Sequence, residues 1–175
     1  MNTPAANLLV LVGEHFACIK IVGRANFTLS IDFKTLLTGL RQKGYDFFVI
    51  ELSECMLMDS TFMGVLAGFG LKMSQAEGNA AAHPIELRNP NARVSELLEN
   101  LGVLHLFKVT EGPLTAPEAL ETCATDAAHP SRAEVTRACL EAHQTLMEIH
   151  PENVARFKEV TRFLAEDLQK LEDKP

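Results

Sequence analysis

The residues best suited to chemistry lie between Cys55 and Gly68, in the stretch CMLMDSTFMGVLAG. This stretch places one carboxylate and two hydroxyls, on Asp59, Ser60 and Thr61, between an apolar run and a glycine-rich apolar run. Such a cluster can supply a nucleophile, a metal site, a phosphoryl acceptor or the N-cap of a helix. A cap accounts for one polar residue but not for three, so this cluster is the candidate functional site.

Motifs of the common enzyme classes are absent from the sequence. It contains no G-x-S-x-G, no H-E-x-x-H and no Walker A loop. The histidine closest to Ser60 along the chain is His83, at the start of a later strand. His143 and His150 are seven residues apart and have no metal-ligand spacing, so we interpret the histidines as solvated or capping residues. These observations predict a protein that is not an enzyme and that uses no metal or other cofactor.

Composition limits the partners and the compartment. The 175 residues are 47% hydrophobic, which is enough for one domain with a core and some additional tail. The net charge of −7 argues against nucleic acid or an anionic membrane as the main partner. The four cysteines form no C-x-x-C pair, the N-terminus has no basic segment typical of a signal peptide, and no apolar run approaches the ~20 residues that span a bilayer. We therefore expect a cytoplasmic protein with reduced cysteines in its core.

Hydrophobic periodicity divides the first two-thirds of the chain into strands and helices. Alternating or continuous apolar runs predict strands at 7–13, 15–25, 46–53, 83–89 and 105–110. Helical spacing predicts helices within 26–44, 60–78 and 89–102. The resulting order ββαβαβαβ predicts an α/β fold with a mainly parallel or mixed sheet and with its helices mostly on one face.

The glycine-rich helix at 60–78 is unusual because neither of its faces is charged. One arc of the helix carries side chains expected to face the core: Phe62, Val65, Leu66, Phe69, Met73 and Ala76. The opposite arc carries small and apolar residues where a solvated helix has Lys and Glu: Ser60, Met63, Gly64, Ala67, Leu71 and Ser74. We interpret this arc as a docking surface for a partner, through Met63, Gly64, Ala67 and Leu71. The alternative is that the C-terminal part of the chain covers it.

The composition shifts after Glu111, which predicts a linker at 112–130 and a C-terminal extension at 131–175. Ser131 and Glu134 have the spacing of a capping box, and two narrow apolar stripes follow on either side of Pro151. The extension is therefore predicted to form two helices broken near Pro151. Because such short helices are marginal alone, we expect them to pack on the preceding domain or in a homodimer.

The position of the polar cluster suits a switch. The N-terminus of a helix accepts negative charge, because its first N–H groups are unpaired and the helix dipole is positive there. A phosphate on Ser60 or Thr61 would therefore be tolerated by the fold. It would also place about −2 charge at the rim of an apolar docking surface.

The same residues resemble the STAS-domain family, and within it the stand-alone bacterial anti-sigma factor antagonists. These proteins carry an apolar strand and then Asp-Ser-Ser/Thr-Gly-x-Gly at the head of the second helix. Here residues 59–64 read DSTFMG, with Phe62 in place of the first glycine. Residues 89–107, NPNARVSELLENLGVLHLF, resemble the closing helix of the family and its leucine-rich ending. The order of elements also agrees, so the resemblance covers about residues 8–111.

The resemblance implies a fold and a mechanism. The fold is a STAS-like mixed sheet with helices mainly on one face, at 1–111, to which this chain adds the helical extension. The function is to bind an anti-sigma factor that is also a serine kinase and thereby to regulate a sigma factor. Phosphorylation of Ser60, or alternatively Thr61, by that kinase ends the binding, and a phosphatase restores it. Asp59 would hold the helix start or orient the hydroxyl.

Three other functions remain open at this point. The first is a STAS scaffold in a signalling or transport complex that is never phosphorylated. The second is a small serine hydrolase built on Ser60, and the third is a nucleotide-binding module. The sequence names neither the partner nor the sigma factor.

Overall fold

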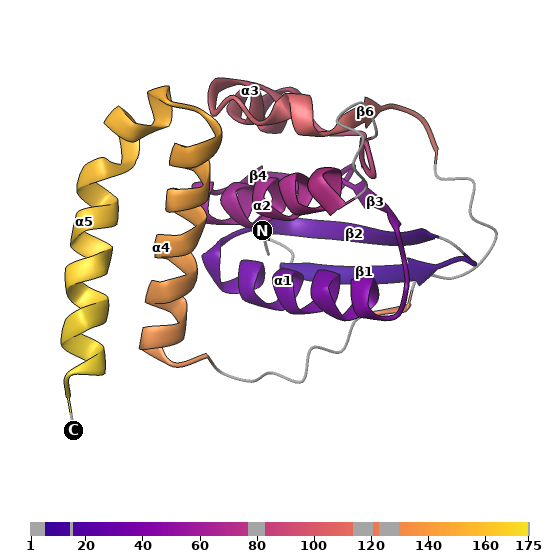
Figure 1. Ribbon diagram of the computed structural model, residues 1–175. Coiled ribbons are helices and arrows are strands. Elements are labelled where there is room, and N and C mark those ends of the chain that lie inside the picture. Colours follow the sequence, from indigo (N-terminus) through magenta and orange to yellow (C-terminus); the bar gives the residue numbers. More distant parts are fainter. Residues whose placement is uncertain (1–5, 15, 77–82, 114–120, 123–129, 175) are drawn as a thin grey trace, which may run out of the picture.

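The structure is a computed structural model that describes residues 6–14, 16–76, 83–113, 121–122 and 130–174. In these residues one mixed sheet is covered on one face by helices, and two further helices stand against the helical layer (Figure 1). None of the described helices is long and apolar enough to cross a membrane.

The sheet is built around the long strand β2. Along its main path the strands follow the order β6-β5-β3-β2-β1-β7, and β4 pairs with the end of β2. β1 is antiparallel to β2 and to β7, whereas β2, β3, β5 and β6 run parallel. The strands span Asn7–Val12 (β1), Phe16–Ala25 (β2), Phe47–Glu51 (β3), Cys55–Met58 (β4), Ile85–Arg88 (β5), Lys108–Thr110 (β6) and Glu121–Thr122 (β7).

The helices begin and end where local capping residues place their boundaries. They span Phe27–Gln42 (α1), Ser60–Ala76 (α2), Ala92–Asn100 (α3), Leu104–Leu106 (the 3-10 helix η1), Arg132–Ile149 (α4) and Glu152–Glu172 (α5). Asn26 and Asn91 cap α1 and α3 by accepting hydrogen bonds from Leu29 N and Val94 N. Gly102 follows the end of α3 with a φ of 69°, a conformation that favours glycine.

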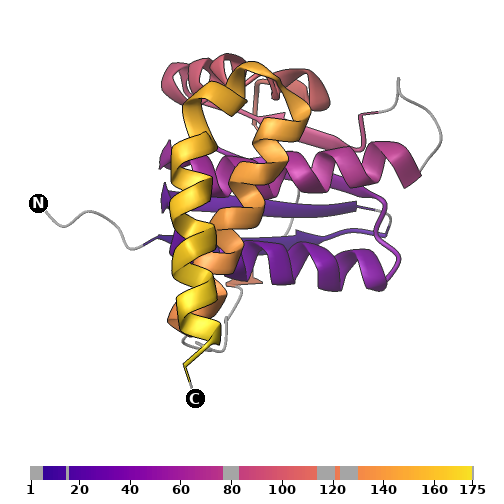
Figure 2. The ribbon, with the colours of Figure 1, turned by 60° about the vertical axis from the view of Figure 1, so that its left-hand side comes forward.

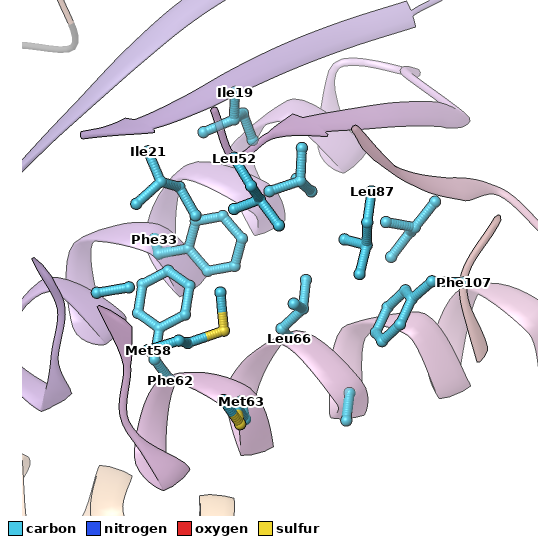
Figure 3. Packing of buried hydrophobic residues seen from close by; sticks show 14 of the residues in the cluster. Ile19, Ile21, Phe33, Leu52, Met58, Phe62, Met63, Leu66, Leu87 and Phe107 are labelled. Atoms are coloured by element: carbon cyan, nitrogen blue, oxygen red, sulfur yellow. The ribbon is translucent and has the colours of Figure 1, made fainter. Parts of the chain in front are cut away.

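The core lies between the sheet and the layer formed by α1 and α2 (Figure 3). The rings of Phe33 and Phe62 stack with their centroids 4.6 Å apart and join the two helices. From the sheet, Ile21 lies next to Phe33, and Leu87 lies on the side of Leu66 and Phe107 (Figure 3). The same alternation that predicted the strands therefore places one face of β2 against the helices.

The predicted fold class is confirmed, with local differences. The sequence did not predict the short strands β4 and β7. The strand predicted at 105–110 is shorter, because residues 104–106 form the turn η1 and only Lys108–Thr110 joins the sheet. Cys18 and Cys55 are buried, and burial raises the pKa of each thiol to about 11.

The two C-terminal helices form a hairpin, α4 and α5 with the turn at 150–151, that packs on the same chain. α4 crosses α1 and α2 and separates them from α5, which lies outermost (Figures 1 and 2). The predicted break near Pro151 is confirmed, since α4 ends at Ile149 and α5 begins at Glu152. The division at 111 and 130 stays a prediction, because residues 114–120 and 123–129 lie outside the described ranges.

A buried polar network joins β5 to β6. Glu86 is 7% exposed, and its Oε1 accepts hydrogen bonds from Thr110 Oγ1 at 2.5 Å and from Arg88 Nη2 at 2.8 Å. Burial acts to raise the pKa of this carboxyl. The hydrogen bonds from Thr110 and Arg88 and the charge of Arg88 outweigh burial and hold the pKa of Glu86 below its ordinary value.

This lowered pKa predicts a pH-dependent contribution to stability. Ionised Glu86 stabilises the fold above its unfolded-state pKa, and this contribution is lost as the pH falls through the lower pKa of the folded state. Glu86→Gln should therefore reduce the free energy of unfolding in urea at pH 7 and reduce it less at pH 3. Equal losses at the two pH values would contradict the assignment.

Candidate functional site

Asp59 fixes the position of the polar cluster by holding the starts of two helices. Its Oδ1 accepts a hydrogen bond from Phe62 N at 2.8 Å, which caps α2, and its Oδ2 accepts one from Phe27 N at 2.7 Å, at the first residue of α1. The backbone N of Asp59 also donates to Ala25 O, at the end of β2. The Asp59 carboxylate therefore holds backbone groups, and its two described bonds leave the Ser60 hydroxyl to another partner.

That partner is His143, on the C-terminal hairpin. Ser60 Oγ lies 2.9 Å from His143 Nε2, and His143 Nδ1 lies 2.6 Å from the carbonyl oxygen of Cys139. Because a carbonyl oxygen only accepts, Nδ1 carries a proton, and in the neutral ring Nε2 accepts the hydroxyl proton of Ser60. His143 is 7% exposed, and the centroids of its ring and the Phe157 ring lie 4.9 Å apart in an edge-on arrangement.

The two hydroxyls of the cluster differ in access. Ser60 is half-buried, whereas Thr61 is only 5% exposed. Phe62, which replaces the first glycine of the family pattern, is fully buried against Phe33. Its bulk therefore points into the core and does not add to the surface beside Ser60.

The face of α2 expected to be open is covered by α4. Gly64 touches the backbone of α4 so closely that a Cβ at this position would lie 2.4 Å from the carbonyl oxygen of Ala142. One turn later, a Cβ on Gly68 would lie 3.3 Å from Thr145 Cγ2. Gly64 thus allows the two helices to approach at backbone distance, and Gly68 leaves room for the side chain of Thr145.

The expectation of an open docking surface is therefore wrong for this structure. Met63 and Ala67 are 1% and 0% exposed, Gly64 is buried, and Leu71 is half-buried. The physical reason is that α4 of the hairpin packs on this helix at Gly64 and Gly68, as the alternative in the sequence analysis had it. Whether these four residues bind another protein stays a prediction.

The contact between Ser60 and His143 was missed by the sequence analysis, which named His83 as the nearest histidine and took the others as solvated or capping. His143 is 83 positions from Ser60, and only the packing of α4 on α2 brings them together. The available signal was that His143 directly follows Ala142, a member of the apolar stripe of α4.

The pair of Ser60 and His143 has the first two parts of a catalytic triad but a different third part. A carboxylate normally orients the histidine of a triad, whereas the Cys139 carbonyl does so here. The nearby carboxylate of Asp59 bonds to Phe27 N and Phe62 N instead. In the described residues no group of three His, Cys, Asp or Glu side chains could hold a metal ion.

Comparison with solved structures identifies the fold. The NMR structure of the protein TM1081 of Thermotoga maritima has a TM-score of 0.50 and 18% identity, and the match covers 63% of this chain and 82% of that one. An anti-sigma factor antagonist from Mycobacterium paratuberculosis has a TM-score of 0.50 and 13% identity, with coverages of 63% and 90%. The anti-sigma factor antagonist SpoIIAA in its unphosphorylated form has a TM-score of 0.49 and 17% identity, and the match covers 60% of this chain and 87% of that one.

The fold implied by the resemblance is thereby confirmed. No family model and no curated protein matches the chain. At identities of 13–18% the matches with a TM-score of 0.50 establish the fold, and the role of each residue rests on the geometry above.

The bridging carboxylate of Asp59 predicts a measurable cap. Asp59→Ala removes an acceptor shared by the starts of α1 and α2 and should lower the free energy of unfolding by about 1–3 kcal/mol. Asp46→Ala, at an exposed position, is the matched control and should change it by less than about 0.5 kcal/mol. Chemical denaturation measures both, and equal effects would contradict the bridge.

The glycines of α1 and α2 predict opposite effects for the same substitution. Gly64→Ala places a methyl group against the Ala142 carbonyl, so α4 must shift, and stability should fall by about 1–3 kcal/mol. Gly39→Ala, in α1, meets nothing within 4 Å and should raise stability by about 0.5–1 kcal/mol. If both substitutions stabilised the protein in thermal unfolding, the close approach of α4 would be wrong.

Proposed function

We propose that this chain is a phosphorylation-switched protein-interaction module that binds an anti-sigma factor with serine kinase activity and so regulates a sigma factor. The observation that carries the proposal is the placement of Ser60, half-buried, at the first residue of α2 on the fold of solved anti-sigma factor antagonists. The chain acts as ligand and substrate in this proposal, not as a catalyst.

Ser60 is the proposed phosphoacceptor, and Thr61 is the alternative. Ser60 is the more accessible of the two hydroxyls, since Thr61 is 5% exposed. The helix cap comes from Asp59, so a change at the Ser60 hydroxyl leaves the cap in place. A phosphate here also lies at the positive end of the α2 dipole, which favours a folded phosphorylated state.

The proposed partner surface is the N-terminal half of α2, with Met63, Gly64 and Ala67, continued by Leu71. A phosphate on Ser60 would place about −2 charge at the rim of these apolar residues and oppose binding there. A phosphatase that removes the phosphate restores binding in this proposal.

Binding to an anti-sigma factor kinase encoded in the same genome tests the switch. Isothermal titration calorimetry should show that Ser60→Ala retains binding and that Ser60→Asp loses at least tenfold in affinity while staying folded by circular dichroism. Equal affinities of the two variants would contradict the charge mechanism.

Phos-tag electrophoresis of the chain recovered from its own cells separates the switch from an unmodified scaffold. A shifted band that disappears in Ser60→Ala supports Ser60, and one that disappears only in Thr61→Val supports the alternative acceptor. Absence of a shifted band under all growth conditions favours the scaffold.

The hydrogen bond between Ser60 and His143 favours one second candidate, a serine hydrolase. The test is labelling by a fluorophosphonate probe. Labelling of Ser60 that depends on His143 would support hydrolysis. An unlabelled, folded protein supports the interaction module.

A further inference from the structure

The hairpin of α4 and α5 occupies the surface that the proposed function assigns to a partner. α4 contacts Gly64 at backbone distance, Met63 and Ala67 beside it are buried, and His143 Nε2 lies 2.9 Å from Ser60 Oγ. Two helices cannot both approach Gly64 at backbone distance. Occupation of this face by α4 and by another protein is therefore mutually exclusive.

The hairpin contributes little to the core of the domain. Among its described side chains, Leu146 alone belongs to the buried core cluster, with Ile149 and Phe157 partly buried against it. Leu140 and Ala142 of α4 are buried as well, outside that cluster. Residues between Leu8 and Phe107 supply the rest of the cluster, so the domain keeps most of its core side chains if the hairpin leaves.

The hairpin is also held together by its own contacts. Arg132 Nη2 lies 3.2 Å from Asp167 Oδ1, and Arg137 forms a second ion pair with Glu172, both between α4 and α5. Phe157 of α5 packs its ring on His143 of α4. These contacts remain if the hairpin moves as a unit.

Polar contacts hold the hairpin on the domain at three places. Near the turn, Asn153 Nδ2 donates to Leu101 O and Arg156 Nη1 donates to Asn100 O, both at the end of α3. Lys34 Nζ of α1 lies 3.4 Å from Glu141 Oε2 of α4. At the third place, Ser60 Oγ lies 2.9 Å from His143 Nε2. This last contact involves the proposed phosphoacceptor, so the state of Ser60 bears directly on how firmly the hairpin is held.

The shape of the contact defines the kind of ligand that fits this face. The Gly64 and Gly68 pair accepts a helix that presents small residues three positions apart, as α4 does with Ala142 at Gly64 and Thr145 at Gly68. A bulky side chain at either helix would prevent this approach.

We propose that the hairpin of α4 and α5 is an intramolecular competitor, which a helix of the partner displaces from α2. This inference rests on the proposed function, and it adds that the free chain is closed. A helical ligand with small residues three apart gains access to Gly64 and Gly68 only when α4 leaves.

The first test uses a labelled peptide of residues 131–150 as the probe, added to the full chain and followed by fluorescence anisotropy. In the Ala142→Leu chain the added bulk meets α2, its own α4 is displaced, and the peptide should bind at least tenfold more tightly than to the unmodified chain. Ala155→Leu, at an exposed position of α5, is the matched control and should bind as the unmodified chain does.

Hydrogen exchange establishes that the domain stays folded in these variants. Ala142→Leu should speed exchange of the amides of α4 and of residues 63–68, while the amides of β2 and β3 stay protected. Equal peptide binding by the unmodified and Ala142→Leu chains, although the amides of α4 exchange faster in Ala142→Leu, would overturn the proposal.

A disulfide supplies a second test that does not depend on the folding of Ala142→Leu. A Cβ on Gly68 would lie 3.3 Å from Thr145 Cγ2, so the pair Gly68→Cys and Thr145→Cys is within reach of a disulfide. The oxidised chain, with the 68–145 bond verified by mass spectrometry, should lose peptide binding, and reductant should restore it to the level of the reduced control. Peptide binding that is the same in both forms would overturn the proposal.

Failure of this inference is distinct from failure of the proposed function. If the oxidised and reduced chains bind an anti-sigma factor kinase equally while Ser60 remains the switch, the function stands and the competition does not. If the peptide tests succeed but Ser60 is never phosphorylated, the competition stands and the switch does not.

Discussion

The carboxylate of Asp59 is the constraint on which the rest of the site depends. One oxygen receives the N–H of Phe62 in α2 and the other receives the N–H of Phe27 in α1, so one side chain sets the relative position of the two helix starts. Once these starts are fixed, Phe33 and Phe62 meet in the core and Ser60 faces away from it toward α4. Asp59, which the sequence marks as a candidate for chemistry, therefore has a structural role, and the neighbouring hydroxyl of Ser60 is left available for another one.

Local patterns were sufficient for most of the fold. Alternation in β2, the apolar run of β3 and the capping residues of α1 and α3 depend on neighbours a few positions away, and each predicted its element. The short strands were not predicted, for the opposite reason. β4 has four residues and β7 has two, and each exists because a long strand offers its edge to pair with. No local pattern of that length distinguishes a strand from a loop.

The candidate site was predicted in part. The features that were predicted depend on residues close to Ser60 in the sequence, and those that were missed depend on residues far from it. The position of Ser60 at a helix start followed from the residues beside it. Its partner His143 did not, because the bond depends on how a separate helix crosses α2. The small and apolar arc of the helix at 60–78 did indicate that something packs on it, but two occupants fitted that pattern. The sequence analysis favoured another protein, whereas the structure places α4 there.

The pairing of β7 with β1 determines what happens to a hairpin that has left its place. Leu9 and Val10 pair with Thr122 and Glu121, so the chain is attached to the edge of the sheet shortly before α4. Only the nine residues 123–131 separate this attachment from the first residue of α4. A tether of that length corresponds to an effective concentration on the order of millimolar. A released hairpin therefore rebinds α2 without a second signal once its competitor dissociates. Any competitor must bind more tightly than the tethered hairpin, whose effective concentration does not fall when the protein is diluted.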